Sequence, residues 1–252
     1  MSTITSARTA ARTAALDRRT ALQLAAGEYD RFVGLLRSLA PEDWTRSTDC
    51  PGWDVRAMAG HVLGQAEMVA SVRQLALQSR AAARAGGDVD AVTAHQVQAF
   101  ARLSRDELVG RFAAVAPRAV RGRRRLATLL GPVPAPGKEL VGDRPERWTF
   151  GYVVEVVLTR DTWMHRVDVA RATGRPLELS PGHDGVLVAD VVAEWADRHG
   201  QPYRLRLTGP AGGTWSSGTG EAELQLDAVE FCRLLSGRGV APAGLLSQQV
   251  PF

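Results

Sequence analysis

Apolar residues recur at helical spacing through the first two thirds of the chain. They predict four long helices, over residues 14–40, 55–85, 88–130 and 149–173. Pro41 ends the first of these helices, and Gly174 provides a C-cap for the last. The third contains a new start at Ser104, which can cap a helix that continues with early acidic residues. Four long helices are typical of a four-helix bundle.

The pattern changes after Pro181, where short segments of alternating polarity appear. The elements expected there are a helix over 183–199, strands over 203–208 and 222–226, and a helix over 228–235. Asp227 can cap the last helix. We therefore predict an α+β protein, with a helical bundle in residues 1–177 and a smaller α+β domain in residues 178–252.

Composition places the chain among ordinary globular proteins, with 45% hydrophobic and 23% charged residues in 252. No apolar run approaches the roughly 18 residues that a membrane helix needs. The first nineteen residues lack the apolar stretch of a secretory signal. The two cysteines, Cys50 and Cys232, are far apart and do not indicate a disulfide framework. We expect a cytoplasmic protein that is not bound to a membrane and is a monomer or a homodimer.

The net charge of +4 comes with a strong bias toward arginine, because Lys138 is the only lysine. Five arginines lie between Arg118 and Arg125. Basic runs can bind a phosphate backbone, but this one has no interleaved aromatic residues and no nucleic-acid motif. We therefore predict a solvated helical face and no nucleic-acid partner. The alternative requires these arginines to form one continuous exposed stripe.

Candidate chemistry centres on Asp161 and His165, four residues apart in the last predicted bundle helix. Side chains at this spacing share a helical face, with Cβ atoms about 5–6 Å apart, and can bind one metal ion. His61 lies in the second predicted helix among small and apolar residues. Two histidines and a carboxylate form a ligand set used by catalytic zinc and other divalent metals. The alternative is that each histidine is hydrogen-bonded within the core.

The other histidines, His95, His183 and His199, are expected to have structural roles, with His183 at the surface or at a helix cap. Asp168 could accept a hydrogen bond from a ligand histidine, or could form a surface ion pair with an arginine at 166 or 171. Cys50, in the loop before the second helix, is expected to be a small buried residue, with zinc ligation as the alternative.

Two segments resemble motifs of the mycothiol-dependent maleylpyruvate isomerase family, which belongs to the DinB-like metalloenzyme superfamily. Residues 48–56 (Thr-Asp-Cys-Pro-Gly-Trp-Asp-Val-Arg) and the following Gly-His pair that ends at His61 resemble its N-terminal signature. The run from Asp161 to Asp168 resembles its second metal motif. The resemblance implies a DinB-like four-helix bundle in which His61, Asp161 and His165 hold zinc, with an open position for a thiolate or water.

The same resemblance implies mycothiol as the cofactor and a small electrophilic molecule as the substrate. Zinc lowers the pKa of a bound thiol, so the thiolate is present at neutral pH. Release of the thiol after bond rotation gives an isomerase, whereas a retained adduct gives a thiol S-transferase. Arg238 resembles a family position where an arginine could bind a substrate carboxylate, and it is our candidate catalytic residue. The alternative is a solvated surface arginine. No residues could be assigned to mycothiol itself.

One departure from the family pattern concerns Asp161, since the isomerase has a glutamate at this position. Aspartate is one methylene shorter, so an ion would have to lie closer to the last bundle helix or be held less firmly. The runner-up function is a non-catalytic bundle that uses the metal as a structural or sensing element. The two functions differ in the site itself, because a structural zinc is closed by a fourth protein ligand and a catalytic zinc keeps an open position.

Overall fold

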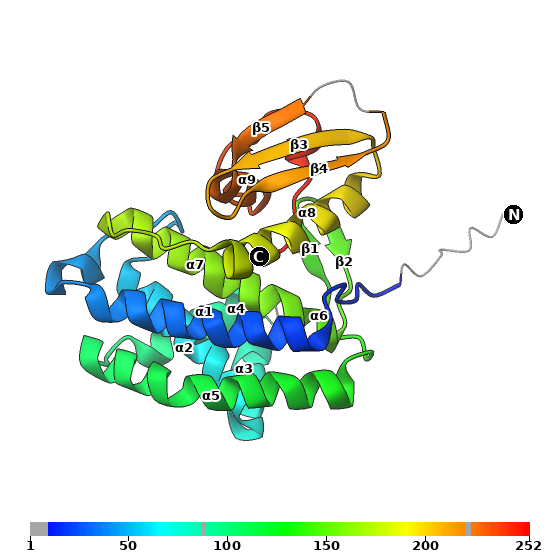
Figure 1. Ribbon diagram of the computed structural model, residues 1–252. Coiled ribbons are helices and arrows are strands. Elements are labelled where there is room, and N and C mark those ends of the chain that lie inside the picture. The colour runs from blue at the N-terminus through cyan, green and yellow to red at the C-terminus, as the bar shows by residue number, and fades with distance from the viewer. Residues whose placement is uncertain (1–9, 87–88, 220–222) are drawn as a thin grey trace, which may run out of the picture.

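A computed structural model describes residues 10–86, 89–219 and 223–252. Its largest unit is a bundle of four helices, in which α1 contacts α5 and α7, and α2 contacts the same two helices. The helices are α1 (Arg18–Ser38), α2 (Val55–Ala70), α5 (Arg105–Leu130) and α7 (Leu158–Thr173). Their apolar faces enclose one core around Phe32, Met58 and Phe112, each fully buried (Figure 1). The predicted bundle is confirmed.

Local capping explains where these helices begin and end. The carboxylate of Asp54 accepts a hydrogen bond from the Ala57 amide and starts α2. Ser104 and Glu107 form a reciprocal capping box at the start of α5. Gly174 ends α7 with a φ of 66°, a left-handed conformation that favours glycine. The start predicted at Ser104 and the glycine C-cap are therefore confirmed.

The helix predicted over 55–85 is interrupted, which corrects the sequence analysis. Ser71 adopts an extended conformation that ends α2, and its hydroxyl accepts a hydrogen bond from the Gln74 amide to start α3 (Val72–Arg84). A further helix, α4 (Val89–Phe100), packs against α2 and α3. The first half of the third predicted helix therefore belongs to a helix pair beside the bundle, and α5 alone completes the bundle.

The segment 131–149, which connects two of the predicted helices, contains a short antiparallel hairpin for which no strands were predicted. Its strands are β1 (Glu139–Val141) and β2 (Arg144–Glu146). The chain then enters α6 (Phe150–Tyr152) and a π-helical turn, η2 (Val153–Val157), which continue directly into α7. Shorter turns are η1 (Pro41–Thr45), η3 (Pro181–Gly185) and η4 (Leu245–Ser247).

The C-terminal part forms a small sheet with two helices. The elements are α8 (Val186–His199), β3 (Tyr203–Thr208), β4 (Gly213–Ser217), β5 (Glu223–Asp227) and α9 (Ala228–Leu235). The central strand β3 pairs antiparallel with β4 and parallel with β5. Along β3 the apolar residues are buried and the arginines between them are exposed, as the alternation predicted. The α+β architecture is thus confirmed.

Helix α7 contributes to two hydrophobic cores. Val169 packs within the bundle core. Trp163, Met164 and Val167 instead pack in a second core with residues of α8, the C-terminal sheet and α9. Figure 1 shows this layer stacked above α7, on the side away from α5. The domain boundary between residues 177 and 178 stays a prediction.

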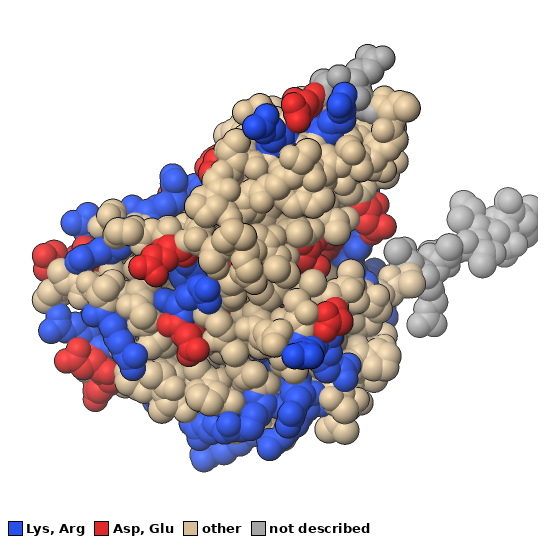
Figure 2. Space-filling view, viewed as in Figure 1, with Lys and Arg blue, Asp and Glu red and all other residues tan. Residues whose placement is uncertain are grey.

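The arginine run on α5 is mostly exposed but includes one core residue. Arg118, Arg121, Arg124 and Arg125 are exposed, and Figure 2 shows basic side chains gathered along the edge of the molecule where α5 lies. Arg123 is fully buried and donates a hydrogen bond to the Tyr29 hydroxyl at 2.6 Å. The predicted solvated face is therefore interrupted, because this guanidinium points inward between helices. Within the described ranges, no helix is both long enough and apolar enough to cross a membrane.

Candidate metal centre

The structure brings together the three predicted ligands from two neighbouring bundle helices. Asp161 and His165 lie one turn apart on α7, and His61 faces them from α2. His61 Nε2 lies 3.5 Å from Asp161 Oδ2, and His165 Nε2 lies 3.3 Å from Asp161 Oδ1. Each histidine is only 4% exposed. Two imidazole nitrogens therefore converge on one carboxylate inside the bundle.

These distances fit a shared divalent ion. Two metal–ligand bonds of about 2.1 Å that meet at 90–110° place the ligand atoms roughly 3.0–3.4 Å apart. The two nitrogen–oxygen distances of 3.5 and 3.3 Å lie close to this range. The combination of two imidazoles and one carboxylate also suits zinc and other divalent transition metals. The residues present thus fit the predicted ion, while its binding and identity stay predictions.

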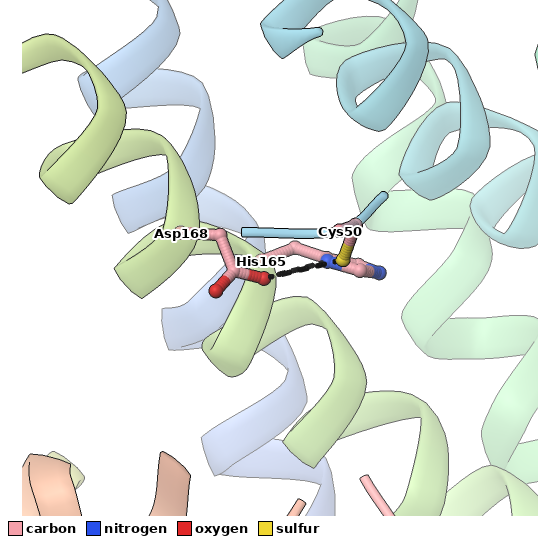
Figure 3. A group of neighbouring side chains, drawn as sticks. All are labelled: Cys50, His165 and Asp168. Carbon is pink, nitrogen blue, oxygen red and sulfur yellow. Dashed lines mark hydrogen bonds and ion pairs between the residues drawn. The ribbon is translucent and has the colours of Figure 1, made fainter. Parts of the chain in front are cut away.

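The second ring nitrogen of His165 is held by Asp168. Figure 3 shows the carboxylate directed at the ring, with 3.3 Å between His165 Nδ1 and Asp168 Oδ2. Asp168 itself is fully buried. A carboxylate on Nδ1 favours the tautomer that leaves Nε2 free to bind a metal. The alternative ion pairs of Asp168 are not formed, since Arg166 and Arg171 bind other carboxylates.

Arg238 lies beside this pair, although it is 70 residues further along the chain than Asp168. It sits just after α9, and its Nε donates to the two carboxylate oxygens of Asp168 at 3.0 and 2.9 Å. Its Nη2 lies 3.5 Å from His165 Nδ1. The side chain is only 13% exposed, so it is not a solvated surface arginine. Its proposed contact with a substrate carboxylate stays a prediction.

Cys50 is half-buried and belongs to the same polar group. Its Sγ lies 3.7 Å from Asp168 Oδ2 and 3.6 Å from Arg238 Nη2. Figure 3 places the sulfur next to the ring nitrogen of His165 that faces Asp168. A tight turn at Gly52, where φ is 80°, directs this loop toward α7. Cys50 therefore has polar neighbours that its position in the sequence did not predict.

An aromatic side chain covers the two histidines. The ring centroid of Trp53 lies 5.1 Å from that of His61 and 5.9 Å from that of His165. The loop that carries it closes on itself through a hydrogen bond from the Thr48 amide to the Trp53 carbonyl. The same loop therefore supplies both Cys50 and an apolar cover for the ligand histidines.

The charges of Asp161 and His165 stabilise each other. Burial by itself would raise the pKa of Asp161, but the two neighbouring histidines outweigh it and hold that pKa well below its usual value. Burial also acts to lower the pKa of His165, yet the Asp161 carboxylate raises it well above its usual value. A metal that binds here must therefore displace a proton from His165.

Gln65 is the residue of this site that the sequence analysis missed. It lies on α2 four residues after His61, and it is 7% exposed. Its Nε2 donates a hydrogen bond to Asp161 Oδ2 at 2.9 Å and lies 3.0 Å from His61 Nε2. The four-residue spacing that paired Asp161 with His165 would also have paired Gln65 with His61.

A second cluster of similar composition contains Glu28, His183 and Asp184. His183 is buried, which corrects its expected surface position. The turn η3 packs it against α1, where a Cβ on Gly27 would lie only 3.0 Å from His183 Nδ1. Its Nε2 lies 2.9 Å from Glu28 Oε2. Here Arg166 binds both carboxylates, so the cluster already contains a cation.

Fold and site together define an α+β protein, built on a four-helix bundle, with two histidines and a carboxylate facing each other across it. The model of the mycothiol maleylpyruvate isomerase N-terminal domain matches residues 25–170, which is more than half of the chain. The protein therefore belongs to this family, and the resemblance found in its two motifs is confirmed at the family level.

Two proteins and two solved structures are also similar to this chain. Uncharacterised proteins from two strains of Mycobacterium tuberculosis are 28% identical to the chain over 225 residues, covering 84% of it and 82% of their own length. The crystal structure of the mycothiol-dependent maleylpyruvate isomerase aligns with a TM-score of 0.54 at 16% identity, over 89% of this chain and 90% of that one. A histidine-to-alanine mutant of the isomerase aligns equally well, at 15% identity. At such low identity the likeness shows the shared fold.

Proposed function

We propose that the protein is a metal-dependent and mycothiol-dependent enzyme, either a maleylpyruvate isomerase-like isomerase or a thiol S-transferase. The observation that carries this proposal is the convergence of His61, His165 and Asp161 inside the bundle, at distances suited to one divalent ion. Family membership over residues 25–170 supports the thiol cofactor. A low-molecular-weight thiol of this kind is kept reduced in the cytoplasm, where we place the protein.

The ion, for which zinc is favoured, would be held by His61, Asp161 and His165. When bound, it would lower the pKa of a coordinated thiol, so that the nucleophilic thiolate is present at neutral pH.

The protein's own residues orient the site and balance its charge. Asp168 holds Nδ1 of His165 at 3.3 Å and so directs Nε2 toward Asp161. Trp53 covers the two histidine rings and limits the access of water from that side. Arg238 brings a guanidinium next to His165, where it could bind the carboxylate of an electrophilic substrate. In this arrangement the substrate's anionic end is anchored close to the ligand histidines.

A second candidate is a non-catalytic bundle in which the ion is structural or sensing. The deep burial of both histidines and the amide of Gln65 between the ligand atoms favour this candidate. The two functions predict different behaviour with a thiol, since only a catalytic site keeps an open position.

Metal analysis and a mycothiol assay test the proposal together. Purified wild-type protein should contain close to one equivalent of divalent metal, and His61→Ala should contain almost none. His183→Ala is the matched control, because it removes a buried histidine from the other cluster and should retain the metal. Mycothiol-dependent turnover of electrophilic substrates, or protection of the wild type by mycothiol, should be lost with the metal. Equal metal content in wild type and His61→Ala would contradict the ligand assignment.

A further inference from the structure

Gln65 has an unusual position for a buried amide. Its Nε2 lies 2.9 Å from Asp161 Oδ2 and 3.0 Å from His61 Nε2, between two of the three candidate ligands. Only 7% of the residue is exposed. The amide nitrogen thus donates to a carboxylate oxygen and lies beside a ring nitrogen of His61, whose role as donor or acceptor depends on its tautomer. Both of these atoms are candidate metal ligands. The positive end of the amide dipole therefore lies at the position between them that a metal cation would occupy.

The other end of the same amide is unsatisfied. Gln65 Oε1 is buried and has no hydrogen-bond partner among the described residues. An unpaired buried acceptor is unfavourable, so this orientation of the amide carries an energetic penalty. A half-turn of the terminal amide exchanges its oxygen and nitrogen without moving the rest of the side chain. The oxygen would then lie about 2.9–3.0 Å from the two ligand atoms, the spacing expected for atoms that share one ion.

We infer that Gln65 is a fourth metal ligand, which binds the ion through Oε1 and, in the metal-free protein, holds the ligand set together through Nε2. This inference rests on the metal binding that the proposed function includes. The position also compensates for Asp161, whose side chain is one methylene shorter than a glutamate. The longer side chain of Gln65, from α2, would supply a further oxygen ligand next to the shorter carboxylate of α7.

Four protein ligands remain compatible with a bound thiol, because zinc can expand to five-coordination. The ligand set becomes two imidazole nitrogens and two oxygens, one of them neutral. Such a mixed set suits five-coordinate zinc and other divalent metals of higher coordination number. Gln65 would therefore affect both the metal that the site prefers and the number of positions left for the thiol.

Cobalt(II) is a suitable probe, since the intensity of its visible absorption bands falls as coordination number rises. We would titrate metal-free wild type, Gln65→Ala and Gln65→Glu with cobalt and with zinc. Gln78→Ala is the matched control, because Gln78 is another buried glutamine. Its Nε2 donates to the Gly64 carbonyl, at a distance of 3.0 Å, and not to a candidate ligand.

Gln65→Ala should bind zinc about 10–100-fold more weakly than the wild type, the loss typical of supporting groups at metal sites. Its cobalt complex should absorb more strongly at saturation, as expected after loss of a ligand. Gln65→Glu should recover the affinity and the weak absorption of the wild type. Gln78→Ala should leave affinity and spectrum unchanged, even where it lowers the free energy of unfolding.

A saturated cobalt spectrum that is identical in wild type and Gln65→Ala would overturn this inference and leave the metal site intact. Failure of the wild type to bind zinc or cobalt would overturn both the inference and the proposed function. Addition of 2-mercaptoethanol distinguishes the inference about Gln65 from the proposed function. A thiolate-to-cobalt band in the wild type supports an open fifth position. If that band appears only in Gln65→Ala, Gln65 is a ligand that closes the site, and the proposed function fails while the inference stands.

Discussion

Two histidine–carboxylate clusters in the described part of the chain, one around His61 and one around His183, have similar composition and different chemistry. Around His61 the groups directed at Asp161 are neutral or titratable, namely two imidazoles and one amide. Around His183 the guanidinium of Arg166 lies between Glu28 and Asp184, at 2.6 and 2.5 Å from their oxygens. The groups directed at Asp161 in the first cluster carry no permanent positive charge, whereas the second cluster already contains a permanent cation.

Hydrogen bonding shows the same difference in more detail. One oxygen of Glu28 accepts from Arg166 Nε and the other lies beside His183 Nε2. The oxygens of Asp184 accept from Arg166 and from the Ser180 amide. A histidine beside carboxylates is therefore a candidate metal site only where no fixed cation satisfies the carboxylates. The second cluster instead connects α1, α7 and the start of α8 as an internal ion network.

The largest expected effect comes from removal of that fixed cation. Arg166→Met would leave two buried carboxylates without their shared cation and should lower the free energy of unfolding by about 3–5 kcal/mol. Arg171→Met is the control on the same helix, because Arg171 is exposed and pairs with Asp49. Arg171→Met should lower the free energy of unfolding by about 0–1 kcal/mol. Urea denaturation of metal-free protein measures both, and similar losses in the two variants would contradict the assignment of Arg166 as the central cation.

A smaller effect is expected from the carboxylate that supports His165. Asp168→Asn should weaken zinc binding by about 10–100-fold. The neutral amide stabilises the metal-binding tautomer of His165 less than the carboxylate does, and it no longer raises the basicity of that ring. Asp184→Asn removes a comparably buried carboxylate from the other cluster and should leave the zinc affinity at the wild-type value. Competition with a chelator of known affinity measures both constants. A loss of zinc affinity in Asp184→Asn as large as in Asp168→Asn would show that the two clusters are not independent.

The smallest effect concerns acid stability. Burial acts to raise the pKa of Asp184, but the charge of Arg166 and several hydrogen bonds outweigh it and lower that pKa. The native state then binds a proton at Asp184 less readily than the unfolded chain does. This contribution to stability is present above the ordinary aspartate pKa of about 3.9 and is lost as the pH falls through the lowered value. The stability difference between wild type and Asp184→Asn should therefore shrink from pH 6 to pH 3, as followed by urea denaturation. A difference that stays constant with pH would contradict this account.

Helix spacing and family motifs were sufficient to predict the bundle and the three candidate ligands. The pair Asp161 and His165 follows from one helical turn, and His61 from the family signature. Gln65 could have been found with the same spacing rule, applied to α2. Ser71 carried the same capping signal as Ser104, but the apolar period on both sides of it concealed the break between α2 and α3.

Other features depend on tertiary packing and leave little trace in the sequence. Arg238 meets Asp168 only because the C-terminal layer folds back onto α7. His183 lies in a Pro-Gly-His-Asp-Gly segment whose composition indicates exposure, yet the turn buries it against α1. Arg123 is one of several arginines in a row, and only the neighbouring Tyr29 and Thr159 identify it as the buried one.

The shared position of α7 limits how this protein could be divided or recombined. A chain that ended at residue 177 would keep all three candidate ligands, but it would expose Trp163, Met164 and Val167 to water. Each of these side chains contributes roughly 1.5–3 kcal/mol through burial. It would also lose Arg238, the arginine that binds Asp168. Separation of the two parts would therefore destabilise both, because the helix that carries the candidate ligands also packs against the C-terminal layer.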